Sequence, residues 1–306
     1  MYMFLYTLDN KRYHTFNYFL KNKFGKKVFK VALDANFSCP NKSTGGCIFC
    51  SDGSKSNIVD NNKSLKEQFE EVKNVMLRKW PDSYYIAYLQ ANTNTYASVD
   101  KLKEIYEPLL KEDNVVGLSI ATRPDCISDE LLDYLEDINK RTFLTIELGL
   151  QSSYDETLEY INRGHTVKDF EDAVNKLKER NIFVVAHIIN GLPNETKDMM
   201  INTAKFINNL KVDAVKIHML HIIENTKLAD IYKEKPFHVL SKDEYIDIVC
   251  EQLTYLDEKI VIERITGDPI LEDLIEPRWL IKKFVLLNDI DKEMKKRNYY
   301  QGIRSK

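Results

Sequence analysis

The sequence predicts an α/β fold in which six to seven βα units form a full or partial (β/α) barrel of the TIM type. Short apolar segments rich in β-branched and aromatic residues recur along the chain, as strands buried on both faces of a parallel sheet require. Segments with helix-capping signals lie between them. Regular alternation of the two patterns predicts a parallel sheet covered by helices.

Seven segments are expected to form the strands. No G-x-G-x-x-G motif follows the first of them, which disfavours the main competitor, a doubly wound open sheet that binds a dinucleotide. The seventh segment has the weakest strand pattern. The expected strands are residues 31–36, 84–90, 115–121, 143–148, 183–189, 214–220 and 260–265.

The helices are marked by their first residues. Ser64 and Ser241 each precede a glutamate by three positions, the capping-box pattern in which two side chains satisfy free amides at a helix start. Ser98, Ser128 and Thr166 are expected as single caps of helices at 99–111, 129–140 and 167–180. Because no linker, repeat or low-complexity segment interrupts the pattern, we expect one domain over residues 1–306.

The charge is unevenly distributed. The net charge is −3, yet residues 1–30 carry seven Lys and Arg against one acid, and residues 278–306 carry nine against three. Both basic extensions contain aromatic residues, a combination that can hold RNA phosphates and stack bases. The alternative interpretation is that they are solvated faces of terminal helices.

Composition also bounds the cellular location. No apolar run reaches 18 residues, so no transmembrane helix is expected. The first residues lack the basic leader of a signal peptide. Five cysteines, three of them clustered, without a secretion signal favour metal binding in a reducing cytoplasm over disulfides.

The three clustered cysteines, Cys39, Cys47 and Cys50, follow the first expected strand with the spacing C-x7-C-x2-C. Asn41 and the pair Gly45-Gly46 would supply the tight backbone that such a loop needs. Three thiolates are one ligand short of a closed structural site. They therefore predict a metal centre with an open coordination position, where chemistry can take place.

The other strand ends also carry polar residues. Barrel enzymes gather their functional groups in the loops after the carboxyl ends of the strands, so these residues are candidates for one site. Cys250 is expected to be a small buried hydrophobe. Taken alone, His187 and His218 would be satisfied core histidines, and Cys126 another small buried hydrophobe. Their recurrence at corresponding points of successive units favours function. The candidates are Gln90, Asn92, Arg123, Asp125, Cys126, Gln151, Arg163, His187, His218 and His221.

With these motifs the chain resembles radical S-adenosylmethionine enzymes. The resemblance rests on the cysteine loop, the polar segment after the second strand, a Gly-x-Gln-Ser turn after the fourth and a Gly-Leu-Pro turn after the fifth. The cysteine spacing departs from the more common C-x3-C-x2-C. Thr-Arg-Pro-Asp at 122–125, Glu-Leu-Gly-Leu-Gln-Ser at 147–152 and Asn-Arg-Gly-His-Thr at 162–166 are similar to the radical domain of the elongator catalytic subunit, which modifies C5 of the tRNA wobble uridine.

Along nearly its whole length the chain resembles a smaller bacterial family of such enzymes. Members are associated with trimming 5-carboxymethylaminomethyl-uridine to 5-aminomethyl-uridine at the wobble position, by means of a 5′-deoxyadenosyl radical. The resemblance implies tRNA as a partner and an electron donor such as flavodoxin or ferredoxin. The motifs that carry it are Phe-Ser-Cys-Pro-Asn at 37–41, residues 90–97, Thr-Gly-Asp-Pro at 266–269 and Gln-Gly at 301–302.

The resemblance also implies cofactors and residue roles. Cys39, Cys47 and Cys50 would hold a [4Fe-4S] cluster whose fourth iron binds S-adenosylmethionine. Gln90 and Asn92 would contact the methionine amino group. Further cofactor contacts would come from Gln151 and Arg163 to the carboxylate or ribose, from His187 to the ribose, and from Asn190, Gly191, Leu192 and Pro193 around the adenine.

The remaining candidates concern the substrate. Cys126 is a candidate hydrogen-atom donor, with packing as the alternative, and Arg123, Asp125, His218 and His221 are candidate substrate contacts. Ala121 stands where many relatives carry an acid, so the ribose contact must come from elsewhere. Two competing functions remain open: a radical enzyme acting on a small molecule or peptide, and a non-catalytic zinc or iron–sulfur module.

Overall fold

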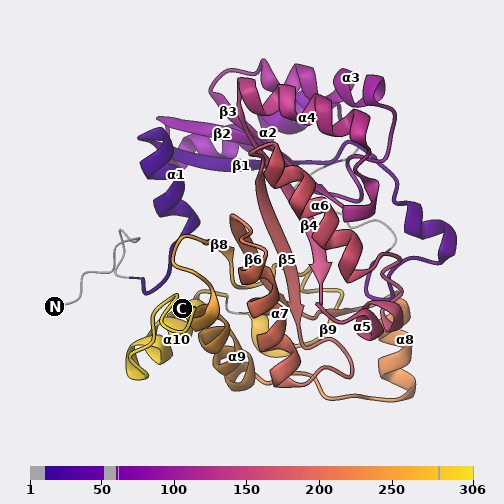
Figure 1. The fold of residues 1–306 in the computed structure, drawn as a ribbon, viewed down its shortest axis with the longest axis vertical. Coiled ribbons are helices and arrows are strands. Elements are labelled where there is room, and N and C mark those ends of the chain that lie inside the picture. Colours follow the sequence, from indigo (N-terminus) through magenta and orange to yellow (C-terminus); the bar gives the residue numbers. More distant parts are fainter. Residues whose placement is uncertain (1–10, 52–59, 61, 282, 306) are drawn as a thin grey trace.

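The computed structural model describes residues 11–51, 60, 62–281 and 283–305, and seven of its strands form one sheet in the order β1-β2-β3-β4-β5-β6-β8. Every neighbouring pair in this sheet is parallel. The sheet curls into a half-barrel, which confirms the predicted partial TIM-type architecture (Figure 1). The strands are β1 (Lys27–Leu33), β2 (Ser83–Leu89), β3 (Val115–Thr122), β4 (Phe143–Gln151), β5 (Phe183–Asn190), β6 (Ala214–Met219) and β8 (Val261–Arg264).

Only the first strand was misplaced by the sequence pattern. The apolar alternation suggests residues 31–36, but β1 ends at Leu33 because a turn follows. The Asp34 side chain accepts a hydrogen bond from the Asn36 backbone N–H at 2.8 Å, and Asn36 has φ 55°, a left-handed conformation that asparagine tolerates and a strand does not. The strand therefore starts earlier, at Lys27.

Helices cover the convex face of the sheet, and their predicted caps are confirmed. Ser64 and Ser241 form capping boxes, as does Thr166 with Asp169, while Ser98 and Ser128 each accept one amide. The helices are α1 (Phe16–Phe24), α2 (Leu65–Lys79), α3 (Val99–Leu110), α4 (Asp129–Arg141), α5 (Asp155–Tyr160), α6 (Val167–Glu179), α7 (Lys197–Asn209), α8 (Lys227–Glu234), α9 (Lys242–Tyr255) and α10 (Lys283–Lys296).

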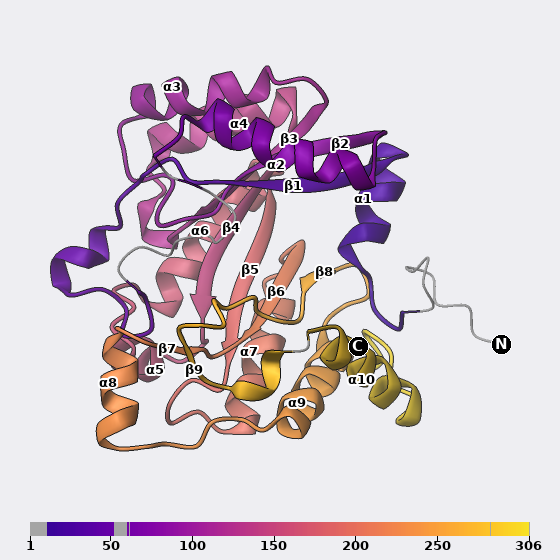
Figure 2. The same ribbon diagram turned by 180° about the vertical axis from the view of Figure 1, so that it is seen from behind.

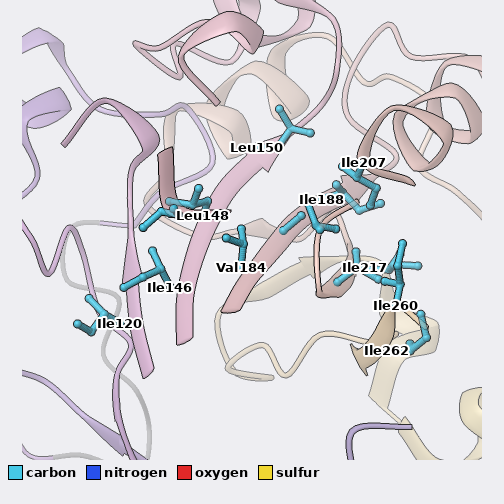
Figure 3. Packing of buried hydrophobic residues seen from close by; sticks show 14 of the residues in the cluster. Ile120, Ile146, Leu148, Leu150, Val184, Ile188, Ile207, Ile217, Ile260 and Ile262 are labelled. Carbon is cyan, nitrogen blue, oxygen red and sulfur yellow. The ribbon is translucent and has the colours of Figure 1, made fainter. Parts of the chain in front are cut away.

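The main core lies between the sheet and these helices. Figure 3 shows aliphatic side chains from neighbouring strands, among them Ile146, Val184 and Ile217, packed side by side; all three are fully buried. Burial of such side chains contributes about 1.5–3 kcal/mol each to folding. This core holds the strands in register, and so fixes the positions of the loops at their carboxyl ends.

The two edge strands, β1 and β8, do not pair with each other. Their side chains nevertheless meet across the open side of the half-barrel, since Lys30 Nζ lies 2.7 Å from Glu263 Oε2. Residues next to α1 complete this edge: the Ile262 N–H donates to the His14 carbonyl at 2.8 Å, and α1 lies beside both strands (Figure 2). Phe16 and Phe19 pack against the first residues of the central strands, so α1 closes the amino end of the half-barrel.

Residues 11–15 and the segment after α10 meet at this amino end. The Arg12 guanidinium donates to the Tyr299 carbonyl, and the Gln301 side chain joins the His14 N–H to the Ile260 carbonyl just before β8. The last turn of α10 and the carboxyl terminus lie on the α1 side in Figure 1, whereas the cysteine loop follows the opposite end of β1. The start of α10 lies elsewhere, because Lys283 pairs at 2.7 Å with Asp268 in the segment that follows β8.

A second, two-stranded sheet was not predicted. Strands β7 (Ile222–Ile223) and β9 (Leu274–Glu276) pair antiparallel and join the segment after β6 to the segment after β8. None of the described helices is long and apolar enough to cross a membrane. A single domain spanning 1–306 stays a prediction, because residues 1–10 lie outside the described range.

Candidate active site at the carboxyl ends of the strands

A cavity of about 240 Å³ opens at the carboxyl ends of the half-barrel strands. Most of the cofactor-contact residues predicted from the sequence line it, although they come from loops far apart in the chain. A parallel sheet places all its carboxyl ends at one edge, which is why these loops converge. The lining residues are Tyr88, Gln90, Asn92, Ala121, Thr122, Glu147, Gly149, Gln151, Arg163, His187, Lys216, His218 and Arg264.

Gly149 allows two of these side chains to lie directly against β4. A Cβ at Gly149 would come within 2.5 Å of Arg163 Nη2 and 2.6 Å of Gln151 Nε2. Gln151 itself has φ 74° and sits at a register shift that turns its side chain into the cavity. Arg163 Nη2 donates to the Gly149 carbonyl at 2.9 Å. The motif 147–152 is therefore a strand end shaped around an arginine and an amide.

The cysteine loop is a short 3₁₀ turn closed by two glycines in left-handed conformation, Gly45 (φ 93°) and Gly46 (φ 71°). Asn41 ties it to the segment after α5, because its amide donates to the Asn162 carbonyl at 2.6 Å. Arg163 follows directly and donates from Nη1 to Cys47 Sγ at 3.6 Å. The loop and the arginine of the cavity are thus one unit.

The three predicted cluster cysteines interact electrostatically. A hydrogen bond from the Cys50 thiol, with help from Arg163 and Asn41, lowers the pKa of Cys47 to about 5 in spite of burial. The same hydrogen bond and the charges of Cys47 and Cys39 raise the pKa of Cys50, an exposed residue, well above its usual value. The shared proton therefore stays on Cys50 while Cys47 is held as a thiolate, and cluster iron would bind both as thiolates.

The donor chemistry of this loop fits an iron–sulfur cluster. Among the described residues, no group of three or more His, Cys, Asp and Glu side chains is arranged to hold a metal ion. The three thiols are therefore not preset as ligands of one ion, and in a cluster each cysteine binds a different iron. N–H donors to sulfur, here Asn41 and Arg163 to Cys47, are the groups that tune cluster thiolates.

Below the cavity a buried carboxylate, Glu147, collects hydrogen bonds from five strands. Lys30 and Ser119 contact Oε1 at 2.6 and 2.8 Å. On the other oxygen, Tyr88 donates to Oε2 at 2.8 Å, with His187 Nε2 at 2.7 Å and Lys216 Nζ at 2.5 Å. The two lysines outweigh burial and hold the pKa of Glu147 well below its usual range. Glu263 on β8 pairs with the same lysines and balances the charge.

The two strand histidines face the cavity in neutral form. Burial lowers the pKa of His187, although its hydrogen bond to Glu147 opposes this. His187 therefore donates from Nε2 to Glu147, and Nδ1 is left as an acceptor. Burial also lowers the pKa of His218 well below its usual value, with His187 and Arg264 adding to the effect. The two rings lie 5.6 Å apart between centroids.

A second cavity, of about 280 Å³, adjoins the first, since Gln151, His187 and His218 line both. Its wall is mostly apolar, with Phe49 from the cysteine loop and Ile189 from β5. His221, another predicted substrate contact, lines this cavity, and its Nε2 is buried without a hydrogen-bond partner. Together the two cavities offer a polar and an apolar compartment side by side.

The residues predicted to surround the adenine, Asn190 to Pro193, lie at the end of β5 but do not line either cavity. The Asn190 amide forms a reciprocal pair with Gln252, two hydrogen bonds of 2.8 Å each, so it serves the packing of β5 against α9. Gly191 has φ 88°, and Leu192 and Pro193 are buried. Their contact with a cofactor stays a prediction.

Arg123, Asp125 and Cys126 follow β3 and also lie outside both cavity walls. Arg123 is buried and donates to the carbonyls of Arg163 and Gly164, at 2.7 and 2.9 Å, while Asp125 pairs with its guanidinium at 2.8 Å. Arg123 thereby holds the segment that carries Arg163 in position. Burial and the nearby Asp125 raise the pKa of Cys126 to about 11, so the thiol stays protonated, as a hydrogen-atom donor must. Both substrate roles stay predictions.

Sequence reasoning missed the charged floor of the site. Lys30, Glu147 and Lys216 are charged residues inside mostly apolar strands, a signal that was present but not used. Arg264 lies within residues 260–265, the predicted strand with the weakest pattern, and is the last residue of β8. The missed residues that form the floor or line the cavity are Lys30, Tyr88, Ser119, Glu147, Lys216, Glu263 and Arg264.

An open parallel half-barrel, with three thiols in the loop after its first strand and a polar cavity beside them, defines an enzyme class built around an iron–sulfur cluster. The family model described as "Radical SAM superfamily" matches residues 38–207, and the "Radical_SAM C-terminal domain" matches 212–296. The chain belongs to the Radical SAM superfamily and is a radical S-adenosylmethionine enzyme. Its cofactors are a [4Fe-4S] cluster and S-adenosylmethionine, as predicted.

Three relatives place the chain further. It is 46% identical to uncharacterized protein YtqA of Bacillus subtilis, over 98% of this chain and 94% of that protein. It is 29% identical to a tRNA uridine(34) acetyltransferase of Methanocaldococcus jannaschii, over 56% of this chain but only 31% of that protein. The solved structure of Methanocaldococcus infernus Elp3 matches with a TM-score of 0.69 at 21% identity, over 90% of this chain and 64% of that chain. The predicted relationship to the elongator radical domain is thereby confirmed, and a non-catalytic metal module is set aside.

Proposed function

We propose that this enzyme modifies the C5 side chain of the wobble uridine in tRNA, converting 5-carboxymethylaminomethyl-uridine and water to 5-aminomethyl-uridine and glyoxylate. The conversion removes two electrons, which S-adenosylmethionine would take up as it becomes 5′-deoxyadenosine and methionine. The observation that carries the proposal is the similarity to a tRNA uridine(34) acetyltransferase, an enzyme named for its action on uridine 34 of tRNA. The chain spans about a third of that relative, so the shared part is the radical domain rather than the whole activity. The location consistent with this role is the cytoplasm.

Different residues of the cavity would bind the cofactor and the substrate. When bound, the cluster and S-adenosylmethionine together supply a radical that abstracts a hydrogen atom from the substrate. Gln90 and Asn92 would contact the methionine amino group, and Arg163, beside Cys47, its carboxylate, since a guanidinium suits a carboxylate. His187 offers Nδ1 as an acceptor for a ribose hydroxyl, which supplies the contact that Ala121 cannot make.

The neutral ring of His187 depends on the residues below it. Because Glu147 accepts the Nε2 proton, the ring presents an acceptor rather than a donor to the cavity. Lys30 and Lys216 keep Glu147 ionised, and Glu263 cancels their remaining charge. This balance lets a fully buried carboxylate orient the histidine, with Tyr88 and Ser119 holding the carboxylate itself.

The partners follow from the reaction. The substrate would be tRNA, and reduction of the cluster needs an electron donor such as flavodoxin or ferredoxin. Basic extensions were expected to hold the RNA. Lys283, at the start of α10, pairs with Asp268 next to Arg264 of the cavity wall, whereas residues 11–15 and 297–305 lie at the amino end of the half-barrel. Arg297 is paired there with Asp247 and Glu293. The tRNA would have to contact both ends of the sheet for that expectation to hold.

The test uses the anaerobically reconstituted enzyme with S-adenosylmethionine, a chemical reductant and tRNA carrying the carboxymethylaminomethyl group. Nucleoside analysis should show 5-aminomethyl-uridine rising together with 5′-deoxyadenosine. Formation of 5′-deoxyadenosine without any change of the tRNA would contradict the assignment of substrate. It would favour the small-molecule or peptide alternative while the radical chemistry stands.

A further inference from the structure

The cavity contains more positive charge than its own carboxylates neutralise. Lys216 is almost fully buried, and its ammonium is used by Glu147, by Tyr88 at 3.1 Å and, more distantly, by Glu263 at 3.6 Å. Lys30 is likewise shared between the two glutamates. These two cations and two anions form a closed, neutral set.

Arg163 is also committed. Its Nε and Nη2 donate to the Gly149 carbonyl and its Nη1 to Cys47 Sγ. It lies between β4 and the cysteine loop, which is where the cofactor's amino-acid end would bind. This leaves Arg264 as the remaining cation of the cavity wall.

Arg264 is the last residue of β8 and pairs in register with Lys216 on β6. Its nearest anion, Asp268, is 3.5 Å away and also holds Lys283 at 2.7 Å. Within the part of the chain that the structure describes, the Arg264 side chain makes no hydrogen bond. About a third of the side chain (36%) is exposed. Its charge reaches the cavity, because Arg264 contributes to the lowered pKa values of His218 and His221.

We infer that Arg264 is the anchor of a subsite for a carboxylate carried by the substrate, in the cavity wall that it shares with His218. This inference rests on the proposed function, whose substrate bears a carboxymethyl group on its side-chain amine. A planar guanidinium with free N–H groups binds a carboxylate through two parallel hydrogen bonds. A partly desolvated site strengthens that pairing, and the neutral histidines add no competing charge.

The position separates this subsite from the cofactor. Strands β5 and β6 lie between β4, which carries Gln151 at the cofactor side, and β8, which carries Arg264. A side chain extending from a flipped or inserted base could then enter between the two sides. Its reacting carbon would face the cofactor while its carboxylate faced Arg264. The arginine would act by positioning and by selecting substrates that bear the acid.

The test compares binding of two tRNAs to the holoenzyme with S-adenosylmethionine, without reductant so that no turnover occurs. One tRNA carries 5-carboxymethylaminomethyl-uridine and the other 5-methylaminomethyl-uridine, which lacks the carboxylate. The wild type should bind the first about tenfold more tightly, the effect of roughly 1.4 kcal/mol. Arg264→Gln should remove that preference and leave binding of the second tRNA and of S-adenosylmethionine unchanged. Arg264→Lys should recover part of it.

The matched control is Arg180→Gln, which removes an arginine at the end of α6 that pairs with Asp133 away from the cavity. It should keep the preference. If Arg264→Gln lowers the affinity for both tRNAs equally, Arg264 contacts a phosphate. If it lowers the affinity for S-adenosylmethionine, Arg264 contacts the cofactor. Either result overturns the subsite. A wild type that binds both tRNAs equally, or neither, overturns it as well. A preference that Arg264→Gln abolishes, in an enzyme that nevertheless leaves the carboxymethyl group intact, would uphold the subsite and refute the proposed reaction.

Discussion

His187 Nε2 lies 2.7 Å from Glu147 Oε2, so a buried carboxylate fixes which nitrogen of a cavity-lining histidine carries the proton. The ring on β5 can then only accept a hydrogen bond on its cavity side. The Glu147 side chain is buried, and Lys30, Ser119, Tyr88 and Lys216 occupy its remaining hydrogen-bonding positions. The floor of the site is thus a charge-balanced network that determines the chemistry of its wall.

Glu147→Gln should therefore destabilise the protein strongly. The change leaves Lys30 and Lys216 buried with Glu263 as their only carboxylate, and breaking a buried ion pair from one side costs about 3–5 kcal/mol. Chemical denaturation of wild type and variant would measure the loss. Glu107→Gln, which breaks a partly exposed pair with Arg141, should cost no more than about 1 kcal/mol. Similar losses in the two variants would contradict the network.

The iron content should depend on three of the five cysteines. Cys39→Ala, Cys47→Ala and Cys50→Ala should each lose most bound iron and the visible absorbance of the cluster after anaerobic reconstitution, because each removes one thiolate. Cys126→Ala should retain both, as its thiol lies outside the cavity walls. Iron loss in Cys126→Ala comparable with the other three would redefine the ligand set.

Gly149→Ala should weaken binding of S-adenosylmethionine. The added Cβ would lie 2.5 Å from Arg163 Nη2 and displace the guanidinium and the Gln151 amide. Loss of one hydrogen bond to a charged group, about 1.5–3 kcal/mol, corresponds to roughly tenfold to a hundredfold in affinity. Calorimetric titration would measure it. Gly25→Ala, where nothing lies within 4 Å of the new Cβ but φ is 72°, should lower stability and leave the affinity for S-adenosylmethionine unchanged.

Glu195 should make stability depend on pH. Burial raises the pKa of Glu195 to about 7, although hydrogen bonds from Ser152 and Thr157 oppose this. The folded state then binds more protons than the unfolded chain between about pH 4.5 and 7, so the free energy of unfolding falls as pH rises through that window. The largest effect is about 3 kcal/mol.

Glu195→Gln removes this dependence, because glutamine stays neutral. The melting temperature of the variant minus that of the wild type should be larger at pH 8 than at pH 5. Melting would be followed by circular dichroism under anaerobic conditions. A difference between the two proteins that is the same at both pH values would show that Glu195 titrates normally.

The sequence was sufficient for the sheet and the loops but not for the contacts between strands. The cysteine loop and Gln151 were predictable because parallel strands bring the loops that follow them to one edge. Lys30 and Glu263 lie 233 residues apart, and no local pattern announces that they meet. The end of β1 was misjudged because an Asx turn at Asp34 resembles a continuing strand.

The most direct measurement for the central claim is mass spectrometry of nucleosides from bulk tRNA of cells with and without this gene. Cells without the gene should accumulate 5-carboxymethylaminomethyl-uridine and lose 5-aminomethyl-uridine and its derivatives. Restoring the gene should reverse the change, whereas the Cys47→Ala variant should not. An unchanged nucleoside profile would contradict the tRNA assignment.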